Sequence, residues 1–295
     1  MVHSTAFVLL CLDVRRTRLD ALQGDGDIDE VEKAAIGACV ALVLKLSEIR
    51  FMPLFMTALE WSRASPERAA RPLAFFRLAC ALSDALRSVF VPFYKHLLAD
   101  AVAYLTSGPT QQQTSSKKAR RTADAAEVGA DALASWSLRA EVVAALRLCF
   151  LHDTSGFVDE ARFNMLLPAL VQQLDAALPP AADDATVFAA DDVLVDCLVQ
   201  LAVAVGQDSQ WRALNRAVLM ATRSPVARPR RLGVAVVAAL VDRLAEEYLV
   251  LLPETMPFLA ELVEDADEDI EAGARQLLTK LSQLADEDIG DLLAA

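Results

Sequence analysis

The stretch PFLAELVEDADEDIEAGARQLLTKL, residues 257–281, predicts one helix, an acidic turn and a second helix. Apolar residues recur three and four positions apart before the turn, and Ile270, Ala274 and Leu277 repeat this spacing after it. Such spacing places apolar side chains on one face of a helix. The acids at 267–269 begin the second helix, where the positive end of the helix dipole favours negative charge. The stretch therefore predicts two amphipathic helices packed as a hairpin.

The same helical spacing recurs along nearly the whole chain, and no segment shows the sustained alternation of a strand. We expect pairs of helices over residues 28–47 and 50–61, 67–88 and 91–105, 132–151 and 158–176, 183–205 and 209–222, and 226–245 and 253–264, then 267–284 and a short helix over 286–293. Pro53, Pro92 and Pro253 each follow bulky apolar residues and are expected in the first turn of a second helix, where a proline loses no hydrogen bond.

The spacing of these prolines points to a repeat. Pro53 and Pro92 lie 39 residues apart, and Pro168 follows Pro92 at close to twice that distance. A period near 40 with two helices per unit is typical of HEAT or armadillo solenoids. The predicted fold class is therefore all-α: an α-solenoid of HEAT-like helical hairpins with a disordered insert.

The insert is predicted at 106–130, which lacks apolar periodicity and is long for a connection in a compact array. It divides the chain into N-terminal HEAT-like hairpins at 1–105, which start in the middle of an array, and C-terminal hairpins with an acidic cap at 131–295. A basic cluster in this linker is a nuclear-import candidate, with a merely soluble linker as the alternative. Its residues are Lys117, Lys118, Arg120 and Arg121.

Composition limits the class of protein. The 295 residues are 55% hydrophobic, which excludes a mostly disordered chain, and the net charge of −13 argues against a general nucleic-acid coat. That charge is concentrated, because the last 42 residues hold twelve acids and only two bases. This region includes a candidate acidic docking cap, made of Glu264, Asp265, Asp267, Glu268 and Asp269.

By contrast, the stretch 209–241 contains no acidic residue. Its six arginines are Arg212, Arg216, Arg223, Arg228, Arg230 and Arg231. The first three are expected on one side of the helix predicted at 209–222, away from its apolar face. Because second helices usually line the binding surface of a solenoid, these arginines are a candidate stripe for RNA phosphates or an acidic partner. The alternative is internal pairing with the acidic C-terminal repeat.

No catalytic, cofactor or metal site is predicted, because the sequence lacks the metal-binding spacings of histidine and cysteine. The tetrapeptide Asp153-Thr154-Ser155-Gly156 superficially matches an aspartic-protease turn, but it ends a predicted helix. The five cysteines lie apart in apolar helical runs, which favours buried thiols in a reducing compartment. The longest apolar run, 34–44, is too short to cross a bilayer.

Several blocks resemble the C-terminal region of one large HEAT-repeat protein family of the small-subunit processome, the U-three small nucleolar RNA-associated protein ten family. These blocks are LSEIRFMPLF (46–55) with Trp61, FFRL (75–78), FVPF (90–93), FLHDTSGFV (150–158), QWRALN (210–215) and LLPETMPFLAEL (251–262). They occur in order from about Leu46 to the C-terminus. The last block is the most specific, because generic HEAT repeats do not share it.

The resemblance implies a non-catalytic scaffold in the nucleus and nucleolus that joins the early subcomplex on the 5′ external transcribed spacer of pre-rRNA. It implies roles in small-subunit rRNA maturation and in transcription of rDNA. The implied partners are processome proteins of that subcomplex, with the phosphate backbone of pre-rRNA or snoRNA as a further candidate and no membrane or small-molecule substrate. Family members are several times longer, so a fragment or a shortened gene model is expected. The alternative is a cytosolic HEAT-repeat adaptor, such as a transport-receptor or phosphatase scaffold fragment.

Overall fold

The computed structural model describes residues 2–13, 25–64, 69–107 and 124–285. Within these ranges it contains twelve α-helices, four 3-10 segments and no strand. The α-helices are α1 (Val2–Leu12), α3 (Asp25–Val43), α4 (Glu48–Arg63), α5 (Ala70–Leu86), α6 (Leu98–Thr106), α7 (Asp124–Leu151), α8 (Glu160–Val171), α9 (Asp184–Val205), α10 (Asp208–Ala221), α11 (Ala227–Leu244), α12 (Leu252–Leu262) and α13 (Glu268–Ala285). The 3-10 segments are η1 (Arg87–Val89), η2 (Val91–His96), η3 (Gln172–Asp175) and η4 (Ala245–Leu251).

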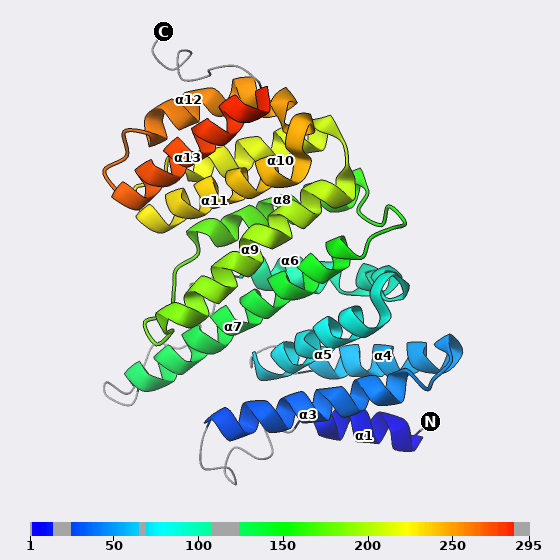
Figure 1. The fold of residues 1–295 in the computed structure, drawn as a ribbon. Coiled ribbons are helices and arrows are strands. Elements are labelled where there is room, and N and C mark those ends of the chain that lie inside the picture. The colour runs from blue at the N-terminus through cyan, green and yellow to red at the C-terminus, as the bar shows by residue number, and fades with distance from the viewer. Residues whose placement is uncertain (1, 14–24, 65–68, 108–123, 286–295) are drawn as a thin grey trace.

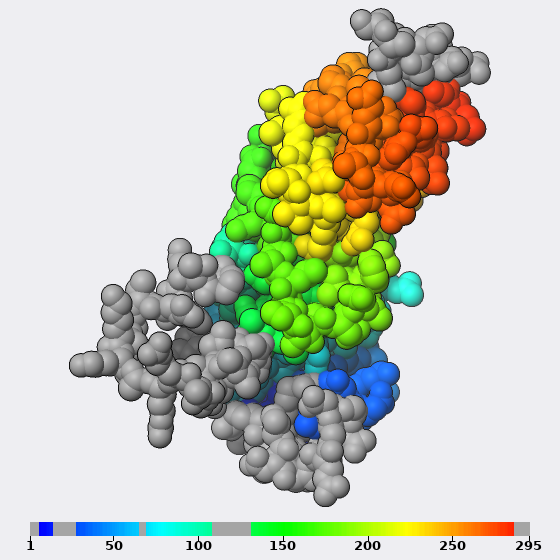
Figure 2. All heavy atoms as spheres, turned by 90° about the vertical axis from the view of Figure 1, so that its left-hand side faces the viewer, coloured from blue at the N-terminus to red at the C-terminus, as the bar shows by residue number. Residues whose placement is uncertain are grey.

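The helices form two layers of a stack. In one layer α3, α5, α7, α9, α11 and α13 pack in chain order, and in the other α6, α8, α10 and α12 do the same (Figure 1). The two termini lie at opposite ends of the stack, and the turned view shows an elongated body in which the chain advances from one end to the other (Figure 2). The predicted all-α solenoid of helical hairpins is confirmed.

Some predicted boundaries need correction. Helix α7 begins at Asp124, so residues 124–130 of the predicted 106–130 linker are helical, and Thr106 still belongs to α6. The helix predicted at 91–105 begins instead as the 3-10 segment η2. The candidate import residues at 117–121 and the short helix predicted at 286–293 lie outside the described residues.

The three prolines do not share one position. Pro253 lies in the first turn of α12, and Pro92 lies in the first turn of η2, as expected. Pro53 lies inside α4, five residues after Glu48, where a proline leaves one helical carbonyl without its usual donor. The predicted helix start at residue 50 is therefore two residues late, because α4 begins directly after Ser47 with Glu48 in its first turn, where the helix dipole favours an acid.

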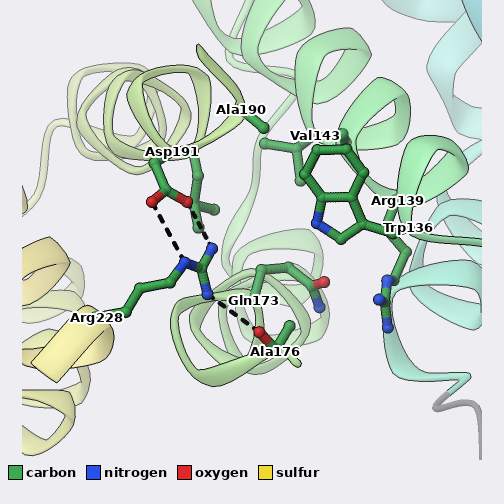
Figure 3. Close-up of a pocket in the computed structure, with 10 residues that line it drawn as sticks. Trp136, Arg139, Val143, Gln173, Ala176, Ala190, Asp191 and Arg228 are labelled. Carbon is green, nitrogen blue, oxygen red and sulfur yellow. Dashed lines mark hydrogen bonds and ion pairs between the residues drawn. The ribbon is translucent and has the colours of Figure 1, made fainter. Parts of the chain in front are cut away.

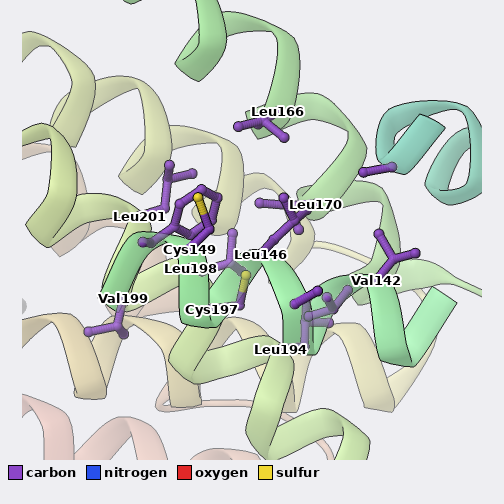
Figure 4. Close-up of a cluster of buried hydrophobic side chains, with 14 of the residues drawn as sticks. Val142, Leu146, Cys149, Leu166, Leu170, Leu194, Cys197, Leu198, Val199 and Leu201 are labelled. Atoms are coloured by element: carbon purple, nitrogen blue, oxygen red, sulfur yellow. The ribbon is translucent and has the colours of Figure 1, made fainter. Parts of the chain in front are cut away.

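Apolar side chains from both layers meet in a continuous core. Leu146 and Cys149 from α7, Leu170 from α8, and Cys197 and Leu198 from α9 are fully buried and gather at one point (Figure 4). Burial raises the pKa of the Cys149 and Cys197 thiols well above the ordinary value. Cys39 is also buried, whereas Cys11 and Cys80 are half-buried, so the predicted burial of thiols holds for three of the five.

An aromatic cluster joins the N-terminal hairpins. Phe55 of α4 lies 5.9 Å from Phe75 of α5 and 5.8 Å and 5.3 Å from Phe90 and Phe93 at η2, measured between ring centroids. Phe51, one turn earlier on α4, is 5.0 Å from Phe93. Two of the sequence blocks, FMPLF and FVPF, therefore pack against each other and fix α4 against the following hairpin.

Two hairpins share an unusual turn. Arg87 ends α5 with φ 51° and ψ −127°, and Ala245 ends α11 with φ 50° and ψ −126°, a left-handed conformation that favours glycine. A 3-10 segment starts at each, and three residues later a fully buried aromatic, Phe90 or Tyr248, enters the core. The aromatic anchors hold the strained turn in the same place in both units.

The close approach of α10 and α11 gives a stability prediction at Gly233. A Cβ there would lie 2.5 Å from the Cγ2 atom of buried Thr222, so Gly233→Ala is expected to cost about 1–3 kcal/mol of the free energy of unfolding through overpacking. Thr222→Ser removes that methyl group and should restore most of the loss in the double variant. Gly37→Ala is the matched control, because its Cβ would have no neighbour within 4 Å in helix α3. There we expect a gain of about 1 kcal/mol. Urea unfolding followed by circular dichroism gives the free energy of unfolding of the wild type, the two single glycine variants and the double variant. Equal changes in this free energy for Gly233→Ala and Gly37→Ala would contradict the prediction.

Candidate interaction surface

The predicted arginine stripe begins on α10. This helix buries Trp211, Leu214 and Val218 and turns Arg212 and Arg216 away from the core. The Nη1 atom of Arg212 donates to Oε1 of Glu254 on α12 at 3.1 Å. Arg216 is exposed, and no described residue pairs with it.

Arg223 follows α10 and has a defined position. Its Nε and Nη2 atoms donate to the two carboxylate oxygens of Glu261 at 2.8 Å and 2.5 Å. The guanidinium also lies 4.2 Å from the centroid of the Phe258 ring. Hydrogen bonding from Arg223 lowers the pKa of Glu261 below its ordinary value. Glu261 and Phe258 both belong to α12, so Arg223 joins the C-terminal end of α10 to the next hairpin.

The three arginines at the start of α11 also pair within the chain. Arg230 donates through Nε and Nη2 to the carboxylate of Asp265 at 2.8 Å and 2.9 Å, and this hydrogen bonding lowers the pKa of Asp265. Arg228 donates to both oxygens of Asp191 on α9, with Nη2 at 2.5 Å and Nε at 3.3 Å. Arg231 lies 3.6 Å from Asp191 and 5.2 Å from the centroid of the Phe188 ring.

Arg228 connects three hairpins. Besides its pair with Asp191, its Nη1 atom donates to the carbonyl oxygens of Leu174 and Ala176 at the end of η3, at 3.2 Å and 3.1 Å. Asp191 is 4% exposed, so this ion pair is largely desolvated. The sequence contains an indication that Asp191 is buried, because its spacing places it on the same α9 face as the apolar residues Val187, Leu194 and Leu198.

The candidate acidic cap divides into two parts. Asp265 is held by Arg230, and the Oδ1 atom of Asp267 caps α13 by accepting hydrogen bonds from the backbone nitrogens of Asp269 and Ile270, at 3.1 Å and 3.4 Å. Glu264, Glu268 and Asp269 are exposed. Only three of the five acids of the candidate cap are therefore exposed to a partner.

The tetrapeptide at 153–156 closes the turn between α7 and α8. Oδ1 of Asp153 accepts hydrogen bonds from the backbone nitrogens of Ser155 and Phe157, at 3.1 Å and 2.9 Å, and Oδ2 accepts one from Val158 at 2.9 Å. These bonds occupy the carboxylate in shaping the turn. In the described part of the chain, no group of three His, Cys, Asp or Glu side chains could hold a metal ion. Across the same ranges, no helix is long and apolar enough to span a membrane.

Comparison with known protein families shows which family this chain belongs to. The model of the BP28CT (NUC211) domain matches residues 3–158, which covers α1 to α7 and the aromatic cluster. The chain belongs to the BP28CT domain family. The family predicted from the sequence blocks is confirmed, and the arginine and acidic residues at 212–269 lie beyond the matched range.

Relatives of this BP28CT chain cover nearly all of it. HEAT repeat-containing protein 1 of Homo sapiens is 32% identical over 288 residues, which is 97% of this chain and 13% of that protein. U3 small nucleolar RNA-associated protein 10 of Schizosaccharomyces pombe is 28% identical over 292 residues, which is 97% of this chain and 15% of that protein. An uncharacterized protein of Arabidopsis thaliana is 37% identical over 302 residues, which is 97% of this chain and 13% of that protein. The chain thus spans about one seventh of the length of these relatives, and none of these matches indicates a catalytic family.

Proposed function

We propose that this chain is part of a non-catalytic helical-repeat scaffold of the small-subunit processome, acting in nucleolar pre-rRNA processing and small ribosomal subunit biogenesis. The observation that carries the proposal is its similarity, over 97% of its length, to a protein named as associated with U3 small nucleolar RNA. The fold supports a scaffold role, because stacked hairpins expose a long surface that many partners can share.

Localisation and RNA association test this proposal together. A tagged chain is expected in the nucleolus, with U3 small nucleolar RNA enriched over spliceosomal RNAs in its purified complexes. Replacing Lys117, Lys118, Arg120 and Arg121 by alanine tests the basic cluster, and we expect it to reduce nuclear entry. A diffuse cytosolic signal for the intact chain, without U3 enrichment, would contradict the proposal and favour a cytosolic HEAT-repeat adaptor.

The arginine stripe allows a sharper test of RNA contact. Since Arg212 and Arg223 already pair with Glu254 and Glu261, changing them also breaks contacts between hairpins. Arg216→Glu changes only the exposed, unpaired member. If Arg216 binds a phosphate, the variant should weaken binding to a pre-rRNA fragment and reduce the slope of log affinity against log salt by about 1. Arg243→Glu, also exposed but on α11, is the control. Unchanged affinity of the Arg216 variant at about 50 mM salt would refute phosphate binding there, since such contacts are strongest at low salt.

A further inference from the structure

A small cavity lies where α7, α9, η3 and α11 meet. Its volume is about 30 Å³, and its polar lining comes from Trp136 and Arg139 of α7, Gln173 of η3, Asp191 of α9 and Arg228 of α11. In Figure 3 the Trp136 ring and Arg139 lie on one side, the Asp191–Arg228 pair lies on the other, and Gln173 lies between them. Five of the six stripe arginines have carboxylate partners, whereas Arg139, a further arginine that lines the cavity, has none among the described residues.

Arg139 has no partner among the described residues. Its Nε atom is buried without a hydrogen bond, and no described carboxylate pairs with its guanidinium. Burial lowers the pKa of Arg139, because no nearby carboxylate compensates for the lost hydration of the charge. An unpaired, partly buried cation is unfavourable in the free chain.

The side chains that line the cavity carry a net positive charge, because Arg139 and Arg228 face only Asp191, although the whole chain carries −13. Both oxygens of Asp191 are occupied by Arg228, and Arg231 lies 3.6 Å from the same carboxylate. Two guanidinium groups therefore share the Asp191 carboxylate, and that of Arg139, on the other side of the cavity (Figure 3), pairs with no described carboxylate. Next to them the ring of Phe188, 52% exposed, lies under Arg231 and offers an apolar surface.

We propose that this cavity is a docking site for a carboxylate side chain of a protein partner, which pairs with Arg139. Arginine and tryptophan together are typical of interface hot spots, and guanidinium binds carboxylate in a two-pronged geometry. The volume suits the tip of one side chain. Asp175 and Asp192 are exposed and adjacent in sequence to the lining residues Ala176 and Asp191, so a partner with basic residues flanking the inserted acid fits this surface better than a nucleic-acid backbone. The inference goes beyond the proposed scaffold function and does not depend on the nucleolar assignment.

The first test uses the stability of the free chain. If Arg139 is unpaired, Arg139→Met removes a poorly solvated charge and should raise the Tm by about 2 °C. Arg243→Met, at an exposed arginine of α11, should leave the Tm unchanged. A lower Tm for Arg139→Met would show that bound water or the chain itself satisfies this guanidinium, and it would overturn the proposal.

The second test measures binding with a defined probe. The peptide acetyl-AKAEAKA-amide is titrated into the full chain while the ¹⁵Nε resonance of Arg139, assigned from its absence in Arg139→Met, is followed by NMR. We expect the glutamate peptide to shift this resonance and the matched peptide with glutamine in place of glutamate to leave it in place. No shift, or equal shifts with both peptides, would overturn the proposal. A larger shift with oligouridylate than with the glutamate peptide would assign the cavity to phosphate and would overturn it as well.

Discussion

Asp191→Ala is expected to lower the free energy of unfolding by about 3–5 kcal/mol, because it leaves a buried guanidinium without its counter-charge. Arg228 would keep only the carbonyl oxygens of Leu174 and Ala176 as partners, and its side chain is 16% exposed. Since Arg228 connects α9, α11 and η3, we expect all three elements to lose stability in the variant. Urea unfolding measures the total, and hydrogen exchange of α9 and α11 amides shows where the stack opens.

Two variants make this result specific. Asp192→Ala changes the exposed neighbour and should alter stability by less than about 0.5 kcal/mol. The double change Asp191→Leu with Arg228→Met replaces both charges by apolar groups and should recover most of the loss. A cost below about 1 kcal/mol for Asp191→Ala would mean that water reaches the pair, since exposed pairs contribute little.

Phe55→Ala is expected to cost about 3–5 kcal/mol, because it removes the ring at the centre of the aromatic cluster and leaves a cavity. Phe55 is 3% exposed and has four phenylalanine rings within 5.9 Å, from α4, α5 and η2. The remaining rings are fixed on three separate elements, so they cannot all move to fill the space. Thermal unfolding of the variant should begin in the N-terminal hairpins, as measured by exchange of α4 amides.

The controls for Phe55 lie on the same helix. Phe55→Leu keeps most of the volume and should cost less than the alanine change, whereas Ile49→Ala removes a side chain that is 86% exposed and should have little effect. Equal losses for Phe55→Ala and Ile49→Ala would contradict the geometry of the cluster. Intact exchange protection in α4 of the Phe55 variant would do the same.

The helices were predictable because their apolar spacing is regular. The helix predicted at 209–222 is α10, Asp208–Ala221, and the helix predicted at 267–284 is α13, Glu268–Ala285. The turns at Arg87 and Ala245 were not predictable, since neither residue favours a positive φ and the conformation depends on buried Phe90 and Tyr248. Local propensity describes helices well, whereas these turns are decided by tertiary packing.

The candidate surface was predictable in part. The local excess of acids predicts internal pairing with the C-terminal repeat as the alternative for the arginine stripe, and Arg212, Arg223 and Arg230 pair in this way with Glu254, Glu261 and Asp265. The role of Asp191 was missed because it lies 37 residues before Arg228, and local patterns do not show which turn of α9 faces α11. Arg139 carried no sequence signal, because its lack of a partner is visible only once the neighbouring helices are in place.

The ion pairs between hairpins also affect how the molecule would respond to force. Pairs such as Arg63–Asp100, Arg147–Asp196 and Lys280–Asp242 join residues separated by 37, 49 and 38 positions, so each ties one hairpin only to the next. The ends of the chain lie at opposite ends of the stack, so tension applied there acts along it (Figure 1). Because each unit contacts mainly its neighbours, we expect such a stack to open one unit at a time under tension rather than all at once.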